Sequence, residues 1–453
     1  MNFKRHVISN LENWKRSKDR KPLILRGARQ VGKTTLVTEF AKSYDFFISL
    51  NLEKVADKEF FTAYDDVDTI VESLFLSNNI TPDQQRNTLL FIDEIQELPK
   101  AIQILRYFFE EVPELHVIAA GSLLEFAMKE VKSFPVGRVE FLYLYPLNFG
   151  EYLQAINHGT AFEKLTKVPV SPVAHKVLMK LFHRYAIIGG MPEVVKRDIG
   201  SGNLADLPKV YESIWATYKE DVEKYTSNST ERRVIKHVMD TAPLHLDQRI
   251  KFNNFGNSNY RSREVGEAMR NLDSAKIIQL IYPTTDMEPP IKPDIKKFPR
   301  LQFLDTGLVN YTLGIQAQLL GMDDLGNAFK GAMIPHLIAQ ELISLNTITN
   351  TKPHFWVREK KQSSSEVDLV YPYADKVIPI EIKSGATGTL KSLHQFMDRA
   401  NHPYAIRIYA GEFKIHESTT TDGTRFLLMN LPYYLGTQLP KYIEYFVSDY
   451  ALR

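Results

Sequence analysis

A glycine-containing octapeptide near the amino terminus constrains this chain more than any other feature. The segment GARQVGKT, residues 27–34, follows the short apolar run LILR and precedes a segment with helical spacing, residues 34–44. It matches the pattern G-x-x-x-x-G-K-[ST] in the strand-loop-helix context that this pattern requires. Glycines let the backbone wrap closely around phosphates, so that amide N–H groups point inward. The segment predicts a nucleotide site made of Gly27, Ala28, Arg29, Gln30, Val31, Gly32, Lys33, Thr34 and Thr35.

Two side chains of this segment have the chemistry that a magnesium nucleotide requires. Lys33 supplies a positive charge for the β- and γ-phosphates, and the Thr34 hydroxyl is suited to ligate Mg²⁺. The following helix points its positive end at the same anion. The alternative is an ordinary strand-helix turn with a solvated lysine, and the flanking strand and helix argue against it.

A second acidic motif completes the predicted site. The segment LLFIDE, residues 89–94, is an apolar run followed by two acids. Such a strand delivers its carboxylates to the carboxyl edge of a parallel sheet, where ligands bind in open α/β folds. Asp93 fits a Mg²⁺ ligand, and Glu94 fits the residue that polarises the attacking water. Taken alone the pattern also describes a solvated strand end, but together with residues 27–34 it predicts ATP or GTP binding and hydrolysis.

The first 150 residues predict an α/β fold with a parallel sheet. Short apolar runs, several without a polar face, alternate with segments of helical spacing, which is typical of strands covered by helices on both sides. The expected strands are LILR (23–26), FFISLN (46–51), LLFID (89–93), VIAAG (117–121) and FLYLY (141–145).

Two further residues of this region are candidate catalytic groups. Ser122 follows the strand VIAAG and could sense the γ-phosphate through a hydrogen bond, or it could cap the helix predicted at LLEFAM. Arg138 follows a glycine on a predicted loop and could act as an arginine finger, in cis or in trans, or lie exposed on that loop.

These motifs together resemble the prokaryotic AAA-type P-loop ATPases. The resemblance rests on GARQVGKT, the NLE at 51–53, FIDEIQ, the GS at 121–122 and GRVE…YPLNFGEYL, and later on GGMPEVV and FLDTGL. It implies an AAA+-like core at 1–150, a helical lid at 151–228, a winged-helix-like segment at 229–290 and a nuclease-like α/β domain at 291–453. It also implies ATP as the nucleotide and a homo-oligomer in which Arg138 acts on a neighbour.

The carboxyl-terminal region contains a second candidate site. EVD (366–368) and PIEIKS (379–384) fall on predicted neighbouring strands, and Glu381 and Lys383, two residues apart, share a face. Asp368 and Glu381 could hold a second divalent metal ion while Lys383 orients water for phosphodiester cleavage. This resembles the PD-(D/E)xK core of restriction-endonuclease-like folds. Charges alternating on an exposed strand are the alternative. Relatives tend to have a glutamate on the preceding helix where this chain has Pro335, which counts against nuclease activity.

The middle of the chain contains a candidate DNA-contacting helix. The segment at 260–278 has apolar residues at near-helical spacing and carries Arg261, Arg263, Arg270 and Lys276 on or beside it. A helix of this kind followed by a wing suits a DNA major groove. Because acids dilute its charge, an amphipathic helix with a solvated face is the favoured interpretation.

The composition excludes several functional classes. Lys and Arg total 56 against 54 for Asp and Glu, so no overall basic charge indicates nucleic acid, and DNA contact would need a local patch. The absence of cysteine excludes disulfides, thiol catalysis and cysteine-ligated zinc, and it fits a reducing compartment. No apolar run approaches the roughly 18 residues of a membrane span. We expect a cytoplasmic protein.

Three functions follow as hypotheses. The first is an ATP-hydrolysing switch or motor that acts on DNA or a protein partner. The second is a regulatory binding module in which nucleotide occupancy acts as a signal with little turnover. The third is a metal-dependent nuclease. Glu94 beside Asp93 favours the first, because a pure switch does not need an acid that polarises water.

Overall fold

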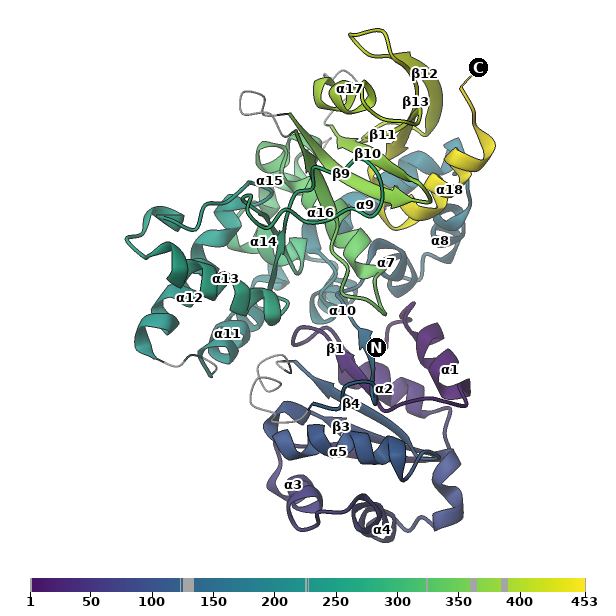
Figure 1. Cartoon of the computed structure of the whole chain (residues 1–453), viewed down its shortest axis with the longest axis vertical. Helices are drawn as coiled ribbons and strands as arrows, with labels where there is room; N and C mark the ends of the chain where they lie inside the picture. The colour runs from purple at the N-terminus through teal and green to yellow at the C-terminus, as the bar shows by residue number, and fades with distance from the viewer. Residues whose placement is uncertain are drawn as a thin grey trace. The chain divides into compact units, whose positions relative to one another are not determined.

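The computed structural model of the chain divides into two units (Figure 1). It describes residues 2–122, 124, 134–224, 226, 228–322, 325–358, 365–383 and 390–452. The first unit comprises Met1–Pro146, Ser274–Ile277 and Asn346–Asn350, and the second comprises Leu147–Asp273, Ile278–Leu345 and Thr351–Arg453. The four-part division expected from the sequence is finer than this and stays a prediction.

The first unit is built on a parallel five-stranded sheet of order β2-β3-β4-β1-β5. Its strands are β1 (Leu23–Arg26), β2 (Phe46–Asn51), β3 (Thr88–Asp93), β4 (His116–Gly121) and β5 (Glu140–Tyr143). The helices described in this unit are α1 (Ile8–Arg16), α2 (Lys33–Ala41), α3 (Val55–Thr62), α4 (Val67–Ser77) and α5 (Pro99–Glu110), with 3-10 turns η1 (Pro82–Asn87) and η2 (Ile95–Glu97).

Burial explains why the central strands carry apolar residues on both faces. Every residue of β3 and β4 is buried. Alternate residues such as Leu90 and Val117 join Leu105 of α5 in one core cluster. This arrangement is the parallel α/β sheet that the alternating pattern predicted, and it brings the carboxyl ends of β1, β3 and β4 to one edge of the sheet.

The second unit begins with a run of helices. These are α7 (Phe149–Ala155), α8 (Gly159–Thr166), α9 (His175–Ile188), α10 (Pro192–Ser201), α11 (Pro208–Lys224), α12 (Ser229–Thr241) and α13 (Ser262–Ser274). The later helices of the unit are α14 (Thr306–Thr312), α15 (Gln316–Leu320), α16 (Met333–Ser344), α17 (Lys391–Met397) and α18 (Leu439–Asp449). Every residue of α16 is buried, so this helix forms the centre of the unit.

The GGMPEVV and FLDTGL segments meet beside α16. Asp305 accepts hydrogen bonds from the backbone N–H of Gly190, at 2.6 Å, and of Leu308, at 3.1 Å. A Cβ atom on Gly307 would lie 1.9 Å from the carbonyl oxygen of Ile188, so only glycine fits this contact. Burial raises the pKa of Asp305 to about 6. The two motifs therefore form a buried polar junction in the second unit.

A six-stranded mixed sheet of order β12-β13-β11-β10-β9-β8 forms the rest of the second unit. Strands β10, β11 and β13 are parallel to one another, and the other three pair antiparallel. The strands are β8 (His354–Val357), β9 (Glu366–Tyr373), β10 (Lys376–Ile382), β11 (Tyr404–Tyr409), β12 (Lys414–Thr419) and β13 (Arg425–Pro432). The end of the predicted PIEIKS strand, residue 384, lies outside the described residues.

The segment between the helices and this sheet is an antiparallel pair, β6 (Ile278–Ile281) with β7 (Arg300–Phe303). The proline-rich stretch that joins them packs against the second sheet. The Thr284 amide donates to the Phe355 carbonyl at 2.8 Å, and Met287 packs on the core of that sheet. The β6–β7 connection is therefore anchored along part of its length, unlike a free wing.

Lys276 lies beside the predicted helix, but its side chain is not exposed. Helix α13 ends at Ser274, and Lys276 is buried with its ammonium 6.0 Å from the centre of the Tyr143 ring. It is therefore no part of an exposed basic face. Arg261, Arg263 and Arg270 are exposed, as a solvated helix face requires. Within the described part of the chain, no helix has the length and apolar character needed to cross a membrane.

Candidate nucleotide site

The loop between β1 and α2 has the close backbone approach that its glycines predict. A Cβ atom on Gly27 would lie 2.3 Å from the carbonyl oxygen of Leu144, at the end of β5. Gly32 has a left-handed φ of 97° and stands immediately before α2. Both positions require glycine, because an L side chain would clash at the first and be strained at the second. The loop can therefore turn its amides towards an anion at the start of α2.

Lys33 is folded back over this loop. Its ammonium donates to the carbonyl oxygens of Gly27 and Ala28, each at 3.0 Å, and the residue is buried. The cationic side chain is thus already held inside the curve of the loop. A phosphate in that curve would meet a positioned ammonium with little further ordering.

Thr34 and Asp93 lie in direct contact although 59 positions separate them. The Thr34 hydroxyl donates to a carboxylate oxygen of Asp93 at 2.7 Å. Burial raises the pKa of Asp93, and the hydrogen bond from Thr34 partly offsets that effect. The structure thus brings the carboxyl end of β3 to the first turn of α2, which is the juxtaposition that the two motifs imply.

Glu94 and Gln96 form a pair directly after β3. Glu94 has a left-handed backbone, with φ 50° and ψ 46°. Its carboxylate accepts a hydrogen bond from the side-chain amide of Gln96. A non-glycine residue in this conformation costs about 1–3 kcal/mol, and such strain is concentrated at functional sites. Sequence reasoning missed Gln96, although it stands in the FIDEIQ segment.

Ser122 lies at the carboxyl end of β4, the strand that separates β1 from β3. Its hydroxyl is buried and has no hydrogen-bond partner among the described residues. Residue 123 and residues 125–133 lie outside the described residues, and so does most of the helix that Ser122 could cap. The unsatisfied hydroxyl at this edge is compatible with a contact to bound phosphate.

Arg138 lies at the opposite edge of the sheet. It stands two positions before Glu140, which pairs with Leu23 at the start of β1, whereas the phosphate loop leaves the far end of β1. Its guanidinium pairs with Glu110, at the end of α5, at 2.9 Å. This placement separates Arg138 from the nucleotide site of its own chain, so a finger in cis has no support here, and the finger in trans stays a proposal.

Two further contacts brace the loop, and sequence reasoning missed both. Arg5 is buried and donates to the carbonyl oxygens of Val31, at 3.0 Å, and of Tyr145. Arg29 forms an ion pair with Glu53 at 3.4 Å, which ties the loop to the NLE segment after β2. The Arg5 contact spans 140 positions, and no local pattern indicates it.

The part of the chain that contains this site matches the model of a known family. Residues 19–153 match the family model for an AAA domain. These residues form an AAA-type P-loop domain. The match covers the phosphate loop, β3 with Asp93 and Glu94, and Ser122.

The rest of the chain matches models without an assigned function. Residues 179–319 match one domain of unknown function, and residues 330–434 match another. No curated protein matches the chain.

Several solved structures are similar to parts of the chain. A Walker-type ATPase of Pyrococcus abyssi is 15% identical, with a TM-score of 0.43 over 69% of this chain and 96% of that one. The ORC1 protein of Aeropyrum pernix, solved in complex with DNA, is 14% identical, with a TM-score of 0.30 over 71% and 94%. A signal transduction ATPase with a tetratricopeptide repeat sensor from Pyrococcus horikoshii is 10% identical, with a TM-score of 0.29 over 76% and 48%.

The oxygen donors of the AAA domain fit a magnesium ion. Thr34 offers a hydroxyl and Asp93 a carboxylate, 2.7 Å apart. Mg²⁺ in nucleotide sites is held by one or two such groups and completes its octahedron with water and phosphate oxygens. The described residues contain no cluster of three or more His, Asp or Glu that would hold a metal ion without a nucleotide.

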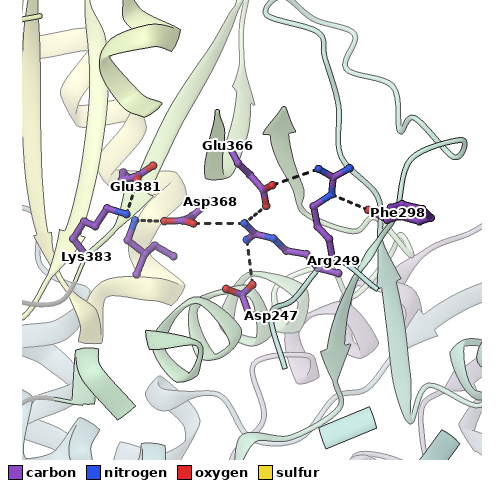
Figure 2. Close-up of polar contacts among 9 residues, drawn as sticks. Asp247, Arg249, Phe298, Glu366, Asp368, Glu381 and Lys383 are labelled. Carbon is purple, nitrogen blue, oxygen red and sulfur yellow. Dashed lines mark hydrogen bonds and ion pairs between the residues drawn. The ribbon is translucent and has the colours of Figure 1, made fainter. Parts of the chain in front are cut away.

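A second cluster of charges lies in the other unit (Figure 2). Asp368 of β9 accepts a hydrogen bond from the Ile382 amide of β10 at 2.9 Å, and Lys383 pairs with Glu381 at 2.7 Å. The three residues singled out from the sequence therefore lie close together. The cluster has a cationic centre, however. Arg300 of β7 pairs with Glu366, with Asp247 at 3.1 Å and with Asp368 at 3.7 Å.

This cluster does not fit a divalent metal ion as it stands. The Asp368 carboxylate is shared between Arg300 and a backbone amide, and Glu381 is paired with Lys383. Glu341, the nearest acid to Pro335 on α16, accepts instead from the Phe149 amide at 3.1 Å and the Tyr185 hydroxyl at 2.7 Å. The Asp368 and Glu341 carboxylates are therefore committed to an internal cation or to hydrogen-bond donors, whereas one oxygen of Glu381 has no hydrogen-bond partner among the described residues.

Proposed function

We propose that the AAA domain binds ATP with Mg²⁺ and hydrolyses it. The contact between Thr34 and Asp93, at 2.7 Å, is the observation that carries the proposal. The Thr34 hydroxyl and the Asp93 carboxylate are oxygen donors suited to Mg²⁺, and the Lys33 ammonium held against the phosphate loop supports the proposal further. ATP, rather than GTP, is proposed from the family match.

Each residue of the site has a defined task in this proposal. The amides of residues 27–34 bind the phosphates, Lys33 neutralises the charge of the β- and γ-phosphates, and Thr34 with Asp93 holds Mg²⁺. When bound, the ion would neutralise phosphate charge. Glu94 accepts the proton of the attacking water, and the Ser122 hydroxyl donates to the γ-phosphate.

A neighbouring copy would complete the site. Arg138 lies away from the nucleotide of its own chain, so we propose that it reaches the γ-phosphate of an adjacent subunit in a homo-oligomer. An ion pair as exposed as that of Arg138 with Glu110 stabilises the fold weakly and can be exchanged for phosphate at small cost.

Hydrolysis would move the second unit on DNA or on a protein partner in the cytoplasm. The winged-helix-like segment at 229–290, which contains α12, α13 and β6, is proposed as the contact region, because Arg261, Arg263 and Arg270 are exposed there. A regulatory module that binds nucleotide with little turnover is the alternative. The strained backbone of Glu94 favours hydrolysis, since a passive switch gains nothing from holding this acid in place.

A metal-dependent nuclease is the weaker alternative for the second unit. The restriction-endonuclease-like fold stays a proposal, and Arg300 stands where a metal would need the carboxylate of Asp368. Nicking of duplex DNA with Mn²⁺ that is lost in Lys383→Ala would support the nuclease. Nicking that survives Asp368→Ala would identify a contaminant.

Calorimetry of ATP binding with Mg²⁺ tests the proposed site. Lys33→Ala is expected to weaken ATP binding by about 10- to 100-fold, because a hydrogen bond to a charged group is worth about 1.5–3 kcal/mol. Lys42→Ala, at the end of the same helix and exposed, is the matched control and should bind ATP as the wild type does. Equal affinities of Lys33→Ala and the wild type would mean that the nucleotide binds elsewhere.

A further inference from the structure

Gln96 lies beside Glu94 in the proposed hydrolytic site, and the function proposed above gives it no task. It stands in η2, two positions after Glu94, and its side chain is only 9% exposed. Its amide nitrogen donates to the Glu94 carboxylate. Only the NH₂ group of a glutamine can donate, so this bond fixes the orientation of the whole amide.

The other atom of that amide is unsatisfied. The Gln96 oxygen is buried and has no hydrogen-bond partner in the parts of the chain that the structure describes. Leaving such an acceptor unpaired costs about 1–3 kcal/mol. This oxygen lies over Gly121, where an added Cβ atom would stand 2.2 Å from it. Gly121 precedes Ser122, whose buried hydroxyl is likewise unsatisfied in the described structure.

We propose that Gln96 is the positioning residue for Glu94 and the acceptor for the attacking water. This inference rests on the proposed ATP hydrolysis. One O–H of the water donates to Glu94 and the other to the Gln96 oxygen, which leaves the oxygen lone pair directed at the γ-phosphorus. As the new P–O bond forms, the bond to the β-γ bridging oxygen breaks, ADP leaves, and the water proton passes to Glu94 and then to solvent.

The position of the Gln96 amide requires glycine at position 121. A methyl group there would occupy the space of the Gln96 oxygen. The β4 backbone at Gly121 has no left-handed φ, so alanine is compatible with the strand itself. The flexible end of Gln96 would therefore move while the strand stays in place.

Steady-state hydrolysis by Gln96→Ala, Gly121→Ala and the double variant tests this assignment. Each single change is expected to lower kcat by about 10- to 100-fold, since small displacements of a reacting group have effects of this size. The KM for ATP should change little, because the phosphate-binding residues are untouched. The double variant should lose no more than Gln96→Ala, since the methyl group added at position 121 then displaces nothing.

Gln84→Ala is the matched control. Gln84 caps η1 through the Thr81 amide, at the beginning of β3 rather than its end, and its loss should leave kcat unchanged. Thermal unfolding and ATP binding of every variant show that the fold and the phosphate site are intact. If Gln96→Ala unfolds, the kcat of Gly121→Ala alone still tests the role of Gln96.

The outcomes distinguish a failure of the role of Gln96 from a failure of the proposed ATP hydrolysis. Wild-type protein that binds ATP without turnover would overturn the proposed hydrolysis. Wild-type turnover that persists at full kcat in Gln96→Ala, or losses that add in the double variant, would overturn the role of Gln96 and leave the ATPase standing.

Discussion

Replacing Arg300 with leucine is expected to lower the free energy of unfolding of the second unit by about 3–5 kcal/mol, because it removes the largely buried cation that Asp247 and Asp368 share, while Glu366 keeps Arg249. The Arg300 side chain is 12% exposed, and its partners Asp247, Glu366 and Asp368 are between 17% and 22% exposed. Burial raises the pKa of Asp247 to about 7 even with Arg300 beside it. Denaturant unfolding monitored by tryptophan fluorescence measures the loss.

An exposed ion pair of the six-stranded sheet is the control for this change. Arg425 pairs with Glu417 across β13 and β12, and the two side chains are 54% and 41% exposed. Exposed pairs contribute about 0–1 kcal/mol, so Arg425→Leu should have little effect. Similar losses in the two variants would mean that Arg300 acts as an ordinary surface charge and that the cluster does not hold β7 to the second sheet.

Replacing Glu341 with glutamine is expected to make the second unit less sensitive to alkaline pH. Burial raises the pKa of Glu341 from its ordinary value of 4.5 to about 8, against the hydrogen bonds from Tyr185 and Phe149. Between these values the folded state binds more protons than the unfolded state, so stability falls as pH rises from about 4.5 to 8. At 1.36 kcal/mol for each pKa unit, the change is at most about 5 kcal/mol.

The measurement is the free energy of unfolding of both proteins at several pH values. The advantage of Glu341→Gln over the wild type should grow through this pH range and then stay constant. Glu444→Gln, on the exposed side of α18, is the control for an ordinary surface glutamate. A difference between Glu341→Gln and the wild type that does not vary with pH would show that Glu341 keeps an ordinary pKa.

The nucleotide site was predictable because its parts obey local rules. The phosphate loop is contiguous, and parallel strands deliver the ends of β3 and β4 to the same edge as the loop after β1. The two motifs, taken with the parallel sheet, therefore predict that Thr34 and Asp93 lie close together. Gln96 could have been found in the same way, since a polar residue two positions after Glu94 at a strand end is a site candidate.

Contacts between segments that are distant in the sequence could not be predicted from it. Arg5 contacts the backbone at Val31 and Tyr145. Arg300 forms ion pairs with Asp247 and with Asp368. No periodicity in the sequence links the residues of either contact. Strand β12 was also missed, because its residues KIHEST are mostly exposed and lack an apolar alternation. The position of Arg138 was likewise not predictable, since a loop arginine after a glycine does not indicate which end of the sheet it lies at; its role as a finger in trans stays a proposal.

Steady-state hydrolysis by wild type and Glu94→Gln, each with and without duplex DNA, tests most directly whether Glu94 activates water on ATP held at residues 27–34. We expect wild-type turnover that falls about 10²- to 10⁴-fold in Glu94→Gln while ATP binding is retained. A rise of the wild-type rate with DNA would add nucleic acid as the partner. ATP binding with no turnover in either protein, or equal turnover in both, would contradict this role of Glu94.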